Sequence, residues 1–465
     1  MTRAFGDDQF ERELRAILDE RAEEVASRAR TAAEMTAEIS PRLMRQSAAH
    51  RQAVLMRLAA IVLAVLLVLV GVMVFGARPS RPPVNLFLAV QLPLAGEPAA
   101  PPVLAAVRQA LADGGGRAGV SLRLMADGVF DDSVDGSANA DRAAENIARI
   151  AADRRYVGVV GPFHSFVAEA TIPVANAAGL LQCSPSNTAP GLTRGPDAAS
   201  LRPRPDRPSY VRLATTDDTA ALAAARLILE LLNKGSVFVV TTVEPWAGGR
   251  TEVFTDAFEG LGGTVAGRAA IGDEGDTPGA VARQIQASGA AAIFFDGPAV
   301  EGARVLAALS SAGTDVPFVG LDIILDGPRS ASGSFLAVAG SAADNAYGVF
   351  PTGADPILGS QVAAAYEAAF GHPPENYVLA GHACVSIILQ AIDRLGAAQL
   401  TDRGDWREAL RAEVTTPGRR YQTAIGAVMF DANGDVQPQR VSIYRGDANA
   451  GDWTFWEMLE LGPGG

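Results

Sequence analysis

Small hydroxylated residues follow two apolar, strand-like runs near the middle of the chain. The first run, 156–162, leads into Ser165, and the second, 180–184, leads into the tripeptide 186–188. In open parallel sheets, ligands lie beyond the carboxyl ends of the strands. Hydroxyls and N–H groups at helix N-termini also bind anions such as carboxylates. The pattern indicates a site for a small carboxylate, although Ser and Thr here can also serve as plain helix caps.

The sequence lacks the patterns of several common catalytic sites. It contains no G-x-S-x-G elbow, no H-E-x-x-H pair and no G-x-x-x-x-G-K-[ST] phosphate loop. The segment 431–435 begins like a calcium loop, but Ser442 stands where a bidentate acid is required. A hairpin turn at Asn433-Gly434 is the better interpretation. We therefore expect no enzyme, and we expect no cofactor or metal.

Charge and cysteine content exclude further classes. The 465-residue chain carries a formal charge of −13, and acids and arginines balance within residues 1–57, so the body beyond them is acidic. An acidic surface argues against nucleic acid as a partner. Cys183 and Cys384 are too few for a disulfide-stapled scaffold. They could pair outside the cell, but we expect them to stay unbonded, because one lies in a predicted core strand and the other in a core helix.

One segment predicts a membrane anchor. Residues 58–77 are uncharged and long enough to cross a hydrocarbon core of ~30 Å. The segment begins too far from Met1 for a typical signal peptide. More arginines precede than follow it, which places residues 1–57, with a helix over 9–38, in the cytoplasm. We expect a single-pass signal anchor, a linker over 78–83 and an extracytoplasmic domain.

Strand and helix patterns alternate from Val84 onward, and the alternation restarts after about residue 215. Apolar strands alternating with amphipathic helices predict an α/β fold with parallel sheets covered on both faces. The repeat predicts two similar, Rossmann-like lobes within 84–461, joined by a hinge and preceded by one transmembrane helix. Asp131, Asp132 and Asp135 form an acidic loop that we expect to be solvated.

Several segments, taken in order, resemble a known family. The main segments are "YVGVVGPFHSFVAEATIPVANAAGLLQCSPSNTAPGLT" (156–193), "YVRLATTDDTAALAAARLIL" (210–229), "EPWAGGRTEVFTDAFEGLGGTV" (244–265) and "AIGAVMFDANGDV" (424–436). Together they resemble the substrate-binding proteins of branched-chain amino acid (LIV-type) ABC transporters, which have the type I periplasmic binding fold. The resemblance extends from about Val84 to Arg445.

The resemblance implies a role for each candidate residue. The ligand's α-carboxylate is gripped by the residues at Ser165, Ser186, Asn187 and Thr188, where Asn187 replaces the family's usual small Ala. An acid after the "VGL" strand, Asp322, meets the α-ammonium group. An aromatic residue of the second lobe closes over the ligand, and Trp246 holds that place.

The resemblance implies lobes formed by 84–214 with 346–424 and by 215–345 with 425–461. We expect a membrane-tethered protein that captures an amino acid or similar small carboxylate and presents it to an ABC permease. One alternative is a sensor ectodomain that signals through the membrane to a cytoplasmic partner. The other is a degenerate lobe pair that binds nothing and serves as a scaffold.

Overall fold

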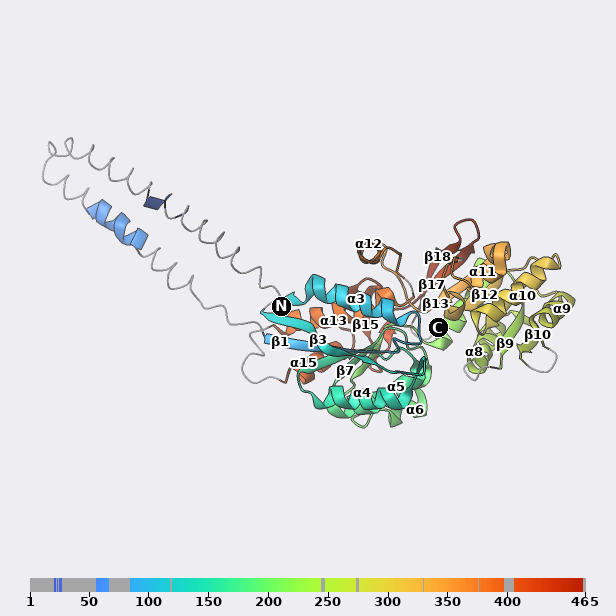
Figure 1. Cartoon of the computed structure of the whole chain (residues 1–465), viewed down its shortest axis with the longest axis horizontal. Coiled ribbons are helices and arrows are strands. Elements are labelled where there is room, and N and C mark those ends of the chain that lie inside the picture. The colour runs from blue at the N-terminus through green and yellow to red at the C-terminus, as the bar shows by residue number, and fades with distance from the viewer. Residues whose placement is uncertain are drawn as a thin grey trace, which may run out of the picture. The chain divides into compact units, whose positions relative to one another are not determined.

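The computed structural model shows a mainly α/β protein (Figure 1). It describes residues 21, 23, 25, 26, 56–66 and 84–462, except 118, 244–246, 273–275, 329, 375 and 397–404. The chain divides into two units, Met1–Arg81 and Pro82–Gly465. The second unit contains two large sheets, each covered by helices, and these form the two lobes that the sequence predicts. A three-stranded and a two-stranded sheet are much smaller.

The first lobe contains a six-stranded sheet of order β2-β3-β1-β6-β7-β8. All neighbouring pairs are parallel except that of β2 with β3. Every residue of β6 is buried, because helices cover both faces of the sheet. The strands are β1 (Val84–Leu92), β2 (Gly116–Arg117), β3 (Val120–Asp131), β6 (Tyr156–Val160), β7 (Leu181–Ser184) and β8 (Tyr210–Arg212).

Alternate side chains of this sheet enter two separate cores. Leu88 and Val90 of β1 pack with residues of α3, α13 and α15, whereas Ala89 packs with residues of α4 and α5. The helices of this lobe are α3 (Ala100–Gly114), α4 (Ala140–Ala152), α5 (Ser165–Ala178), α6 (Gly195–Ser200), α12 (Leu358–Phe370), α13 (Val378–Leu395) and α15 (Trp406–Val414).

The second lobe contains a seven-stranded sheet of order β10-β9-β11-β12-β13-β17-β18. The first five strands are parallel, and β17 and β18 add antiparallel strands at one edge. The strands are β9 (Ser236–Thr242), β10 (Thr264–Ile271), β11 (Ala292–Asp296), β12 (Phe318–Leu321), β13 (Ala346–Phe350), β17 (Gln439–Asp447) and β18 (Asp452–Leu461).

Helices cover both faces of the second sheet as well. One core holds residues of α7 and α8 together with Val239 and Phe294, and the other holds residues of α9 and α10 together with Val240 and Phe295. The helices are α7 (Asp217–Arg226), α8 (Ala247–Gly260), α9 (Pro278–Ser288), α10 (Ala299–Ser311) and α11 (Phe335–Ala339).

The lobe limits stay a prediction, and one strand pairs in a different sheet from the one to which they assign it. The strand β13, which the sequence analysis assigned to the first lobe, hydrogen-bonds within the second sheet. The hairpin predicted at Asn433-Gly434 is confirmed, because β15 (Gly426–Phe430) pairs antiparallel with β16 (Val436–Gln437) across the turn 431–435.

The predicted membrane anchor is described only in part. A short apolar helix, Met56–Leu66, covers the start of the span 58–77, and residues 67–77 lie outside the described part of the chain. Within the described residues, only Val378–Leu395 is both long and apolar enough to cross a membrane. This helix, α13, packs in the core of the first lobe, which accounts for its composition. The anchor and the cytoplasmic tail therefore stay predictions.

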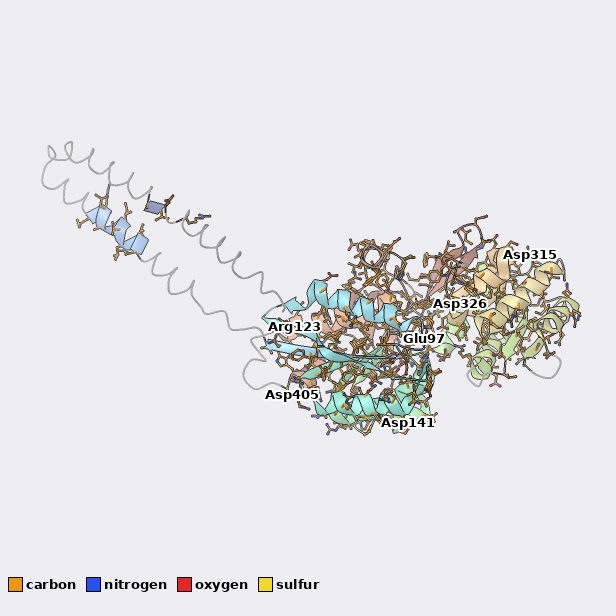
Figure 2. All side chains as sticks on the ribbon, in the orientation of Figure 1. Glu97, Arg123, Asp141, Asp315, Asp326 and Asp405 are labelled. Atoms are coloured by element: carbon orange, nitrogen blue, oxygen red, sulfur yellow. A yellow bond between two sulfur atoms is a disulfide. The ribbon has the colours of Figure 1, made fainter. Side chains whose placement is uncertain are left out.

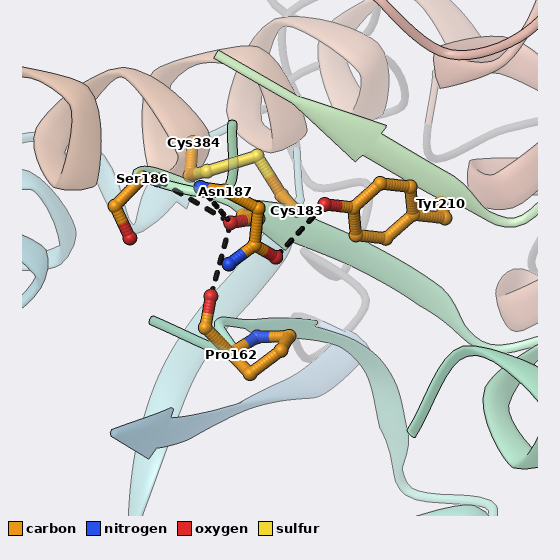
Figure 3. The surroundings of a disulfide bond; sticks show 7 residues. Pro162, Cys183, Ser186, Asn187, Tyr210 and Cys384 are labelled. Atoms are coloured by element: carbon orange, nitrogen blue, oxygen red, sulfur yellow. Dashed lines mark hydrogen bonds between the residues drawn. A yellow bond between two sulfur atoms is a disulfide. The ribbon is translucent and has the colours of Figure 1, made fainter. Parts of the chain in front are cut away.

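The expectation that Cys183 and Cys384 are unbonded is wrong. They form a disulfide between β7 and α13, with their Cα atoms 5.9 Å apart (Figure 3). Membership of core elements does not prevent pairing, because α13 packs directly on the sheet and both cysteines belong to the same core. The bond links residues 201 positions apart and attaches α13 to the sheet of the first lobe.

We expect removal of this bond to destabilise the protein. The Cys183→Ala/Cys384→Ala variant should lose about 2–5 kcal/mol of unfolding free energy, because a closed loop of this length restricts the unfolded chain. Denaturant titration measures the loss. Reducing agent should reproduce it in the wild type and leave the variant unchanged. Equal stability of the two proteins under oxidising conditions would contradict the prediction.

Candidate functional site

Two loops meet at the carboxyl edge of the first sheet, where β6 and β7 end. Gly161 follows β6 with φ of +119°, and a Cβ there would lie 2.0 Å from the carbonyl oxygen of Gln91. Only glycine fits this close approach. The turn then delivers Ser165 as the first residue of α5.

Side chains of the second loop bind the backbone of the first. The Ser184 hydroxyl donates to the carbonyl of Pro162 (3.0 Å) and accepts the N–H of Asn187 (3.0 Å). The Ser186 hydroxyl and the Asn187 amide both donate to the carbonyl of Phe163, each at 2.7 Å. Figure 3 shows Ser186 and Asn187 close to the disulfide. The two loops therefore form one rigid edge.

The structure brings the four predicted carboxylate-binding residues of this lobe together. The Ser165 hydroxyl accepts the N–H groups of Thr188 and Ala189, both at 3.3 Å. Asn187 is fully buried, and its amide oxygen accepts the hydroxyl of Tyr210 at 2.8 Å. The Ser186 and Asn187 side chains thus have partners within the protein, and their contact with a ligand stays a prediction.

A buried ion pair anchors the end of the second loop. Arg212 and Asp435 are 0% and 2% exposed, with Nε and Oδ1 2.7 Å apart. Arg212 also donates to the carbonyl of Ala189 at 2.6 Å and to the hydroxyl of Thr193. The guanidinium of Arg194 lies 3.4 Å from the other Asp435 oxygen. Every charge in the pair is compensated, which a buried pair requires.

A second charged cluster gathers at the strand ends of the other lobe. Arg250 of α8 donates through Nε to Asp296 at 3.0 Å and through Nη2 to the second oxygen of that carboxylate. Its Nη1 lies 3.6 Å from an oxygen of Asp217 and 3.8 Å from one of Asp322. The Arg250 guanidinium therefore has three carboxylate neighbours.

Two contacts connect this cluster to the first lobe. The hydroxyl of Tyr377 donates to Asp322 at 2.6 Å, and the Tyr377 ring packs edge-on against Phe163, 5.5 Å between centroids. The backbone N–H of Asp217 donates to the carbonyl of Thr188 at 2.9 Å. Asp322 is thus connected through Tyr377 to Phe163 in the first loop, and Asp217 contacts Thr188 in the second loop.

Burial and charge oppose each other within the cluster. Burial raises the pKa of Asp296 to about 6, although Arg250 lowers it in part. Burial likewise raises the pKa of Asp217 despite the same guanidinium. Burial alone would lower the pKa of Arg250, but the charges of its three carboxylate neighbours raise it overall.

Sequence reasoning missed several of these residues. Asp296 ends a strand as Asp322 follows one, so the strand-end rule could have found it; Asp217, Arg250 and Tyr377 carry no comparable local signal. Trp246 lies outside the described residues, so its predicted role stays a prediction.

The predicted solvation of the acidic loop is wrong at Asp132. This residue is fully buried, and neither carboxylate oxygen has a hydrogen-bond partner among the described residues. Burial raises the pKa of Asp132 to about 6, although the charge of His164 lowers it in part. Asp131 and Asp135 are exposed as expected. Across the part of the chain that the structure describes, no group of acids, histidines or cysteines is arranged to hold a metal ion.

Comparison with known proteins gives concordant results. A family model described as "Periplasmic binding protein" matches residues 93–451. The Leu/Ile/Val-binding protein BraC3 of Rhizobium johnstonii is 26% identical over 319 residues, which cover 66% of this chain and 79% of that protein.

Solved structures show the same fold. The leucine binding protein LivK of Thermotoga maritima aligns with a TM-score of 0.63 and 21% identity, over 81% of this chain and 99% of that one. A solute binding protein of an ABC transporter from Rhodopseudomonas palustris, in complex with 3,4-dihydroxy benzoic acid, gives 0.62 and 15%, over 81% and 97%.

We expect the buried pair to matter far more than an exposed one. Arg212→Met should lower the unfolding free energy by about 3–5 kcal/mol, because Asp435 stays buried with its main partner removed. Arg154→Met, which removes a largely exposed partner of Asp405 (Figure 2), should cost less than about 1 kcal/mol. Denaturant titration compares the two variants.

A double variant tests the physical reason. Arg212→Met/Asp435→Leu removes both charges and should recover part of the loss. Similar stabilities for Arg212→Met and Arg154→Met would show that the buried pair has no special weight.

Proposed function

Because this chain belongs to the periplasmic binding protein family, we propose that it captures an amino acid or a similar small carboxylate for an ABC transporter. It is a binding protein and not an enzyme. BraC3 is named for leucine, isoleucine and valine, whereas the Rhodopseudomonas protein holds an aromatic carboxylate. Both chemical classes are therefore candidate ligands.

The hydroxyl of Ser165 is the observation that carries this proposal. A serine hydroxyl has two acceptor positions and one donor proton. The N–H groups of Thr188 and Ala189 occupy its acceptor side, and no acceptor for its proton is found among the described residues. The Ser165 proton and the unpaired first-turn N–H groups of α5 are therefore donors suited to a carboxylate.

Carboxylates that can accept an ammonium group are connected to these donors by the contacts described above. Asp217 contacts Thr188, and Asp322 is mostly buried at the end of a strand of the neighbouring lobe's sheet. Donors next to carboxylates match the two ends of a zwitterion. Within this proposal, Ser186 and Asn187 fix the edge that holds Ser165, Thr188 contacts Asp217, and Trp246 closes over the ligand.

We expect an amino acid to bind the wild type and to bind Asp322→Ala about 30-fold or more weakly, because loss of a buried charge contact costs about 2–5 kcal/mol. Isothermal titration of the full chain in detergent against amino acids, amides and aromatic carboxylates measures this. Asp315→Ala, which removes an exposed acid of the same lobe (Figure 2), is the matched control and should bind like the wild type.

The panel also separates the alternatives. Binding of aromatic carboxylates alone, unchanged in Asp322→Ala, would remove the ammonium assignment. An absence of binding across the panel would favour the scaffold alternative over solute capture.

The proposal includes a membrane tether and an extracytoplasmic binding domain. The disulfide between Cys183 and Cys384 supports this location, because such bonds persist in oxidising compartments. The helix Met56–Leu66 lies at the start of the uncharged span 58–77, and the arginines before the span favour a cytoplasmic N-terminus.

We expect the full chain to stay with membranes during alkaline carbonate extraction. Protease added outside spheroplasts should digest residues 84–461 and leave a short N-terminal fragment that contains the tail. Recovery of the intact protein in the soluble periplasmic fraction would contradict the tether. A permease recovered with the tethered protein supports transport, whereas a kinase recovered with it supports the sensor alternative.

A further inference from the structure

The cluster around Arg250 contains more negative than positive charge. Three carboxylates, Asp217, Asp296 and Asp322, surround one guanidinium, which leaves a formal charge of −2 when all are ionised. The side chain of Asp296 is 1% exposed, whereas those of Arg250, Asp217 and Asp322 are 12%, 17% and 19% exposed. Solvent and ligands therefore reach the part of the cluster that faces away from Asp296.

The Arg250 guanidinium interacts unequally with its three carboxylate neighbours. Asp296 takes two hydrogen bonds in a bidentate arrangement, which is the strongest geometry for this pair. Asp217 and Asp322 lie 3.6 and 3.8 Å from Nη1, beyond hydrogen-bond distance. These two carboxylates feel the positive charge of Arg250 without being neutralised by it.

A second anion is therefore disfavoured at this end of the site. A carboxylate approaching Arg250 would also meet the three acids that surround it. An ammonium group would instead gain from Asp217 and Asp322, which retain accessible surface. The charge balance, and not the presence of an arginine, decides which ligand group belongs here.

We propose that Arg250, clamped by Asp296, is a positioning residue that directs the negative charge of two neighbouring carboxylates toward the ammonium group of an amino acid. The two carboxylates are Asp217 and Asp322. The inference rests on the proposed function and narrows its ligand class to amino acids, against carboxylates that lack an amine.

The groups around the cluster support this role. Asp217 faces Arg250, Asp322, the hydroxyl of Thr188 and the more distant charge of Arg212. Without Arg250, burial and repulsion from Asp322 would favour proton uptake by Asp217.

Asp296 and Asp322 have their own charged and polar neighbours. Asp296 faces Arg250 and the two other acids, and Asp322 receives the hydroxyl of Tyr377. Protonation of Asp296 would weaken its hold on the Arg250 guanidinium, whose charge would then compensate Asp217 and Asp322 more fully. Amino acid binding should therefore weaken as pH falls through about 6, the pKa of Asp296.

The test compares an amino acid with the carboxylate of the same carbon skeleton that lacks the amine. Dissociation constants are measured by isothermal titration on the full chain between about pH 5.5 and 8.5, below the pKa of a free amino acid's α-ammonium group, which lies above that of a peptide N-terminus. The wild type should prefer the amino acid by about 100-fold, through the ammonium contact. In Arg250→Met this preference should fall below about tenfold at pH 7 and recover partly toward pH 8.5.

Three further variants keep the test decisive. Arg250→Lys restores the charge and should restore most of the preference. Asp296→Asn should weaken amino acid binding and abolish the change in affinity near pH 6, and it remains informative if Arg250→Met does not fold. Arg304→Met removes an exposed arginine paired with Glu301 on α10 and should match the wild type throughout.

The outcomes distinguish this inference from the function on which it rests. Folded Arg250→Met and Asp296→Asn proteins with wild-type affinities and pH profiles would overturn the role of Arg250 while solute capture stands. A wild type that binds neither ligand at any pH would overturn the proposed function, and this inference with it.

Discussion

The buried pair of Arg212 and Asp435 is the constraint on which the site's geometry depends. The two residues are 223 positions apart, and they meet at the end of β8 and the turn after β15. Taking both charges out of water is costly unless every polar group finds a partner. Arg212 meets this requirement by binding Ala189 and Thr193 as well as Asp435. The bonds that satisfy its buried guanidinium therefore also fix the end of the second loop, which follows β7.

The rigidity of that loop extends to the rest of the site through short contacts. Ser184, Ser186 and Asn187 bind the turn before α5, which fixes the position of Ser165. Thr188 then contacts Asp217 at the start of α7. Donors from one sheet edge and acids from the other are thus held by one set of hydrogen bonds. The disulfide adds a covalent restraint beside them, because it joins β7 to α13.

Local sequence patterns predicted the elements well and their long-range partners poorly. The apolar run 156–162 and the Asn433-Gly434 turn are local signals, and the structure confirms a strand over Tyr156–Val160 and a hairpin at the turn. The disulfide and the pairing of β13 in the second sheet depend on packing between segments far apart, which periodicity does not encode. The strand-end rule pointed to Ser165 and Thr188, and the family resemblance added Asp322. It gave no indication of Arg250, because an arginine early in a polar helix has the same local pattern as a solvated one.

The two halves of the site contribute differently to recognition. A hydroxyl proton and helix N–H groups suit any carboxylate, so the edge at Ser165 alone sets no preference among small acids. Preference arises where the second half adds a fixed charge, since leaving a buried charge unmet costs more than losing a neutral contact. The cluster at Arg250 holds three acids and one base. A fold that brings strand ends together at one edge of a sheet can therefore bind different ligands. The charged side chains at that edge determine which ligand is preferred.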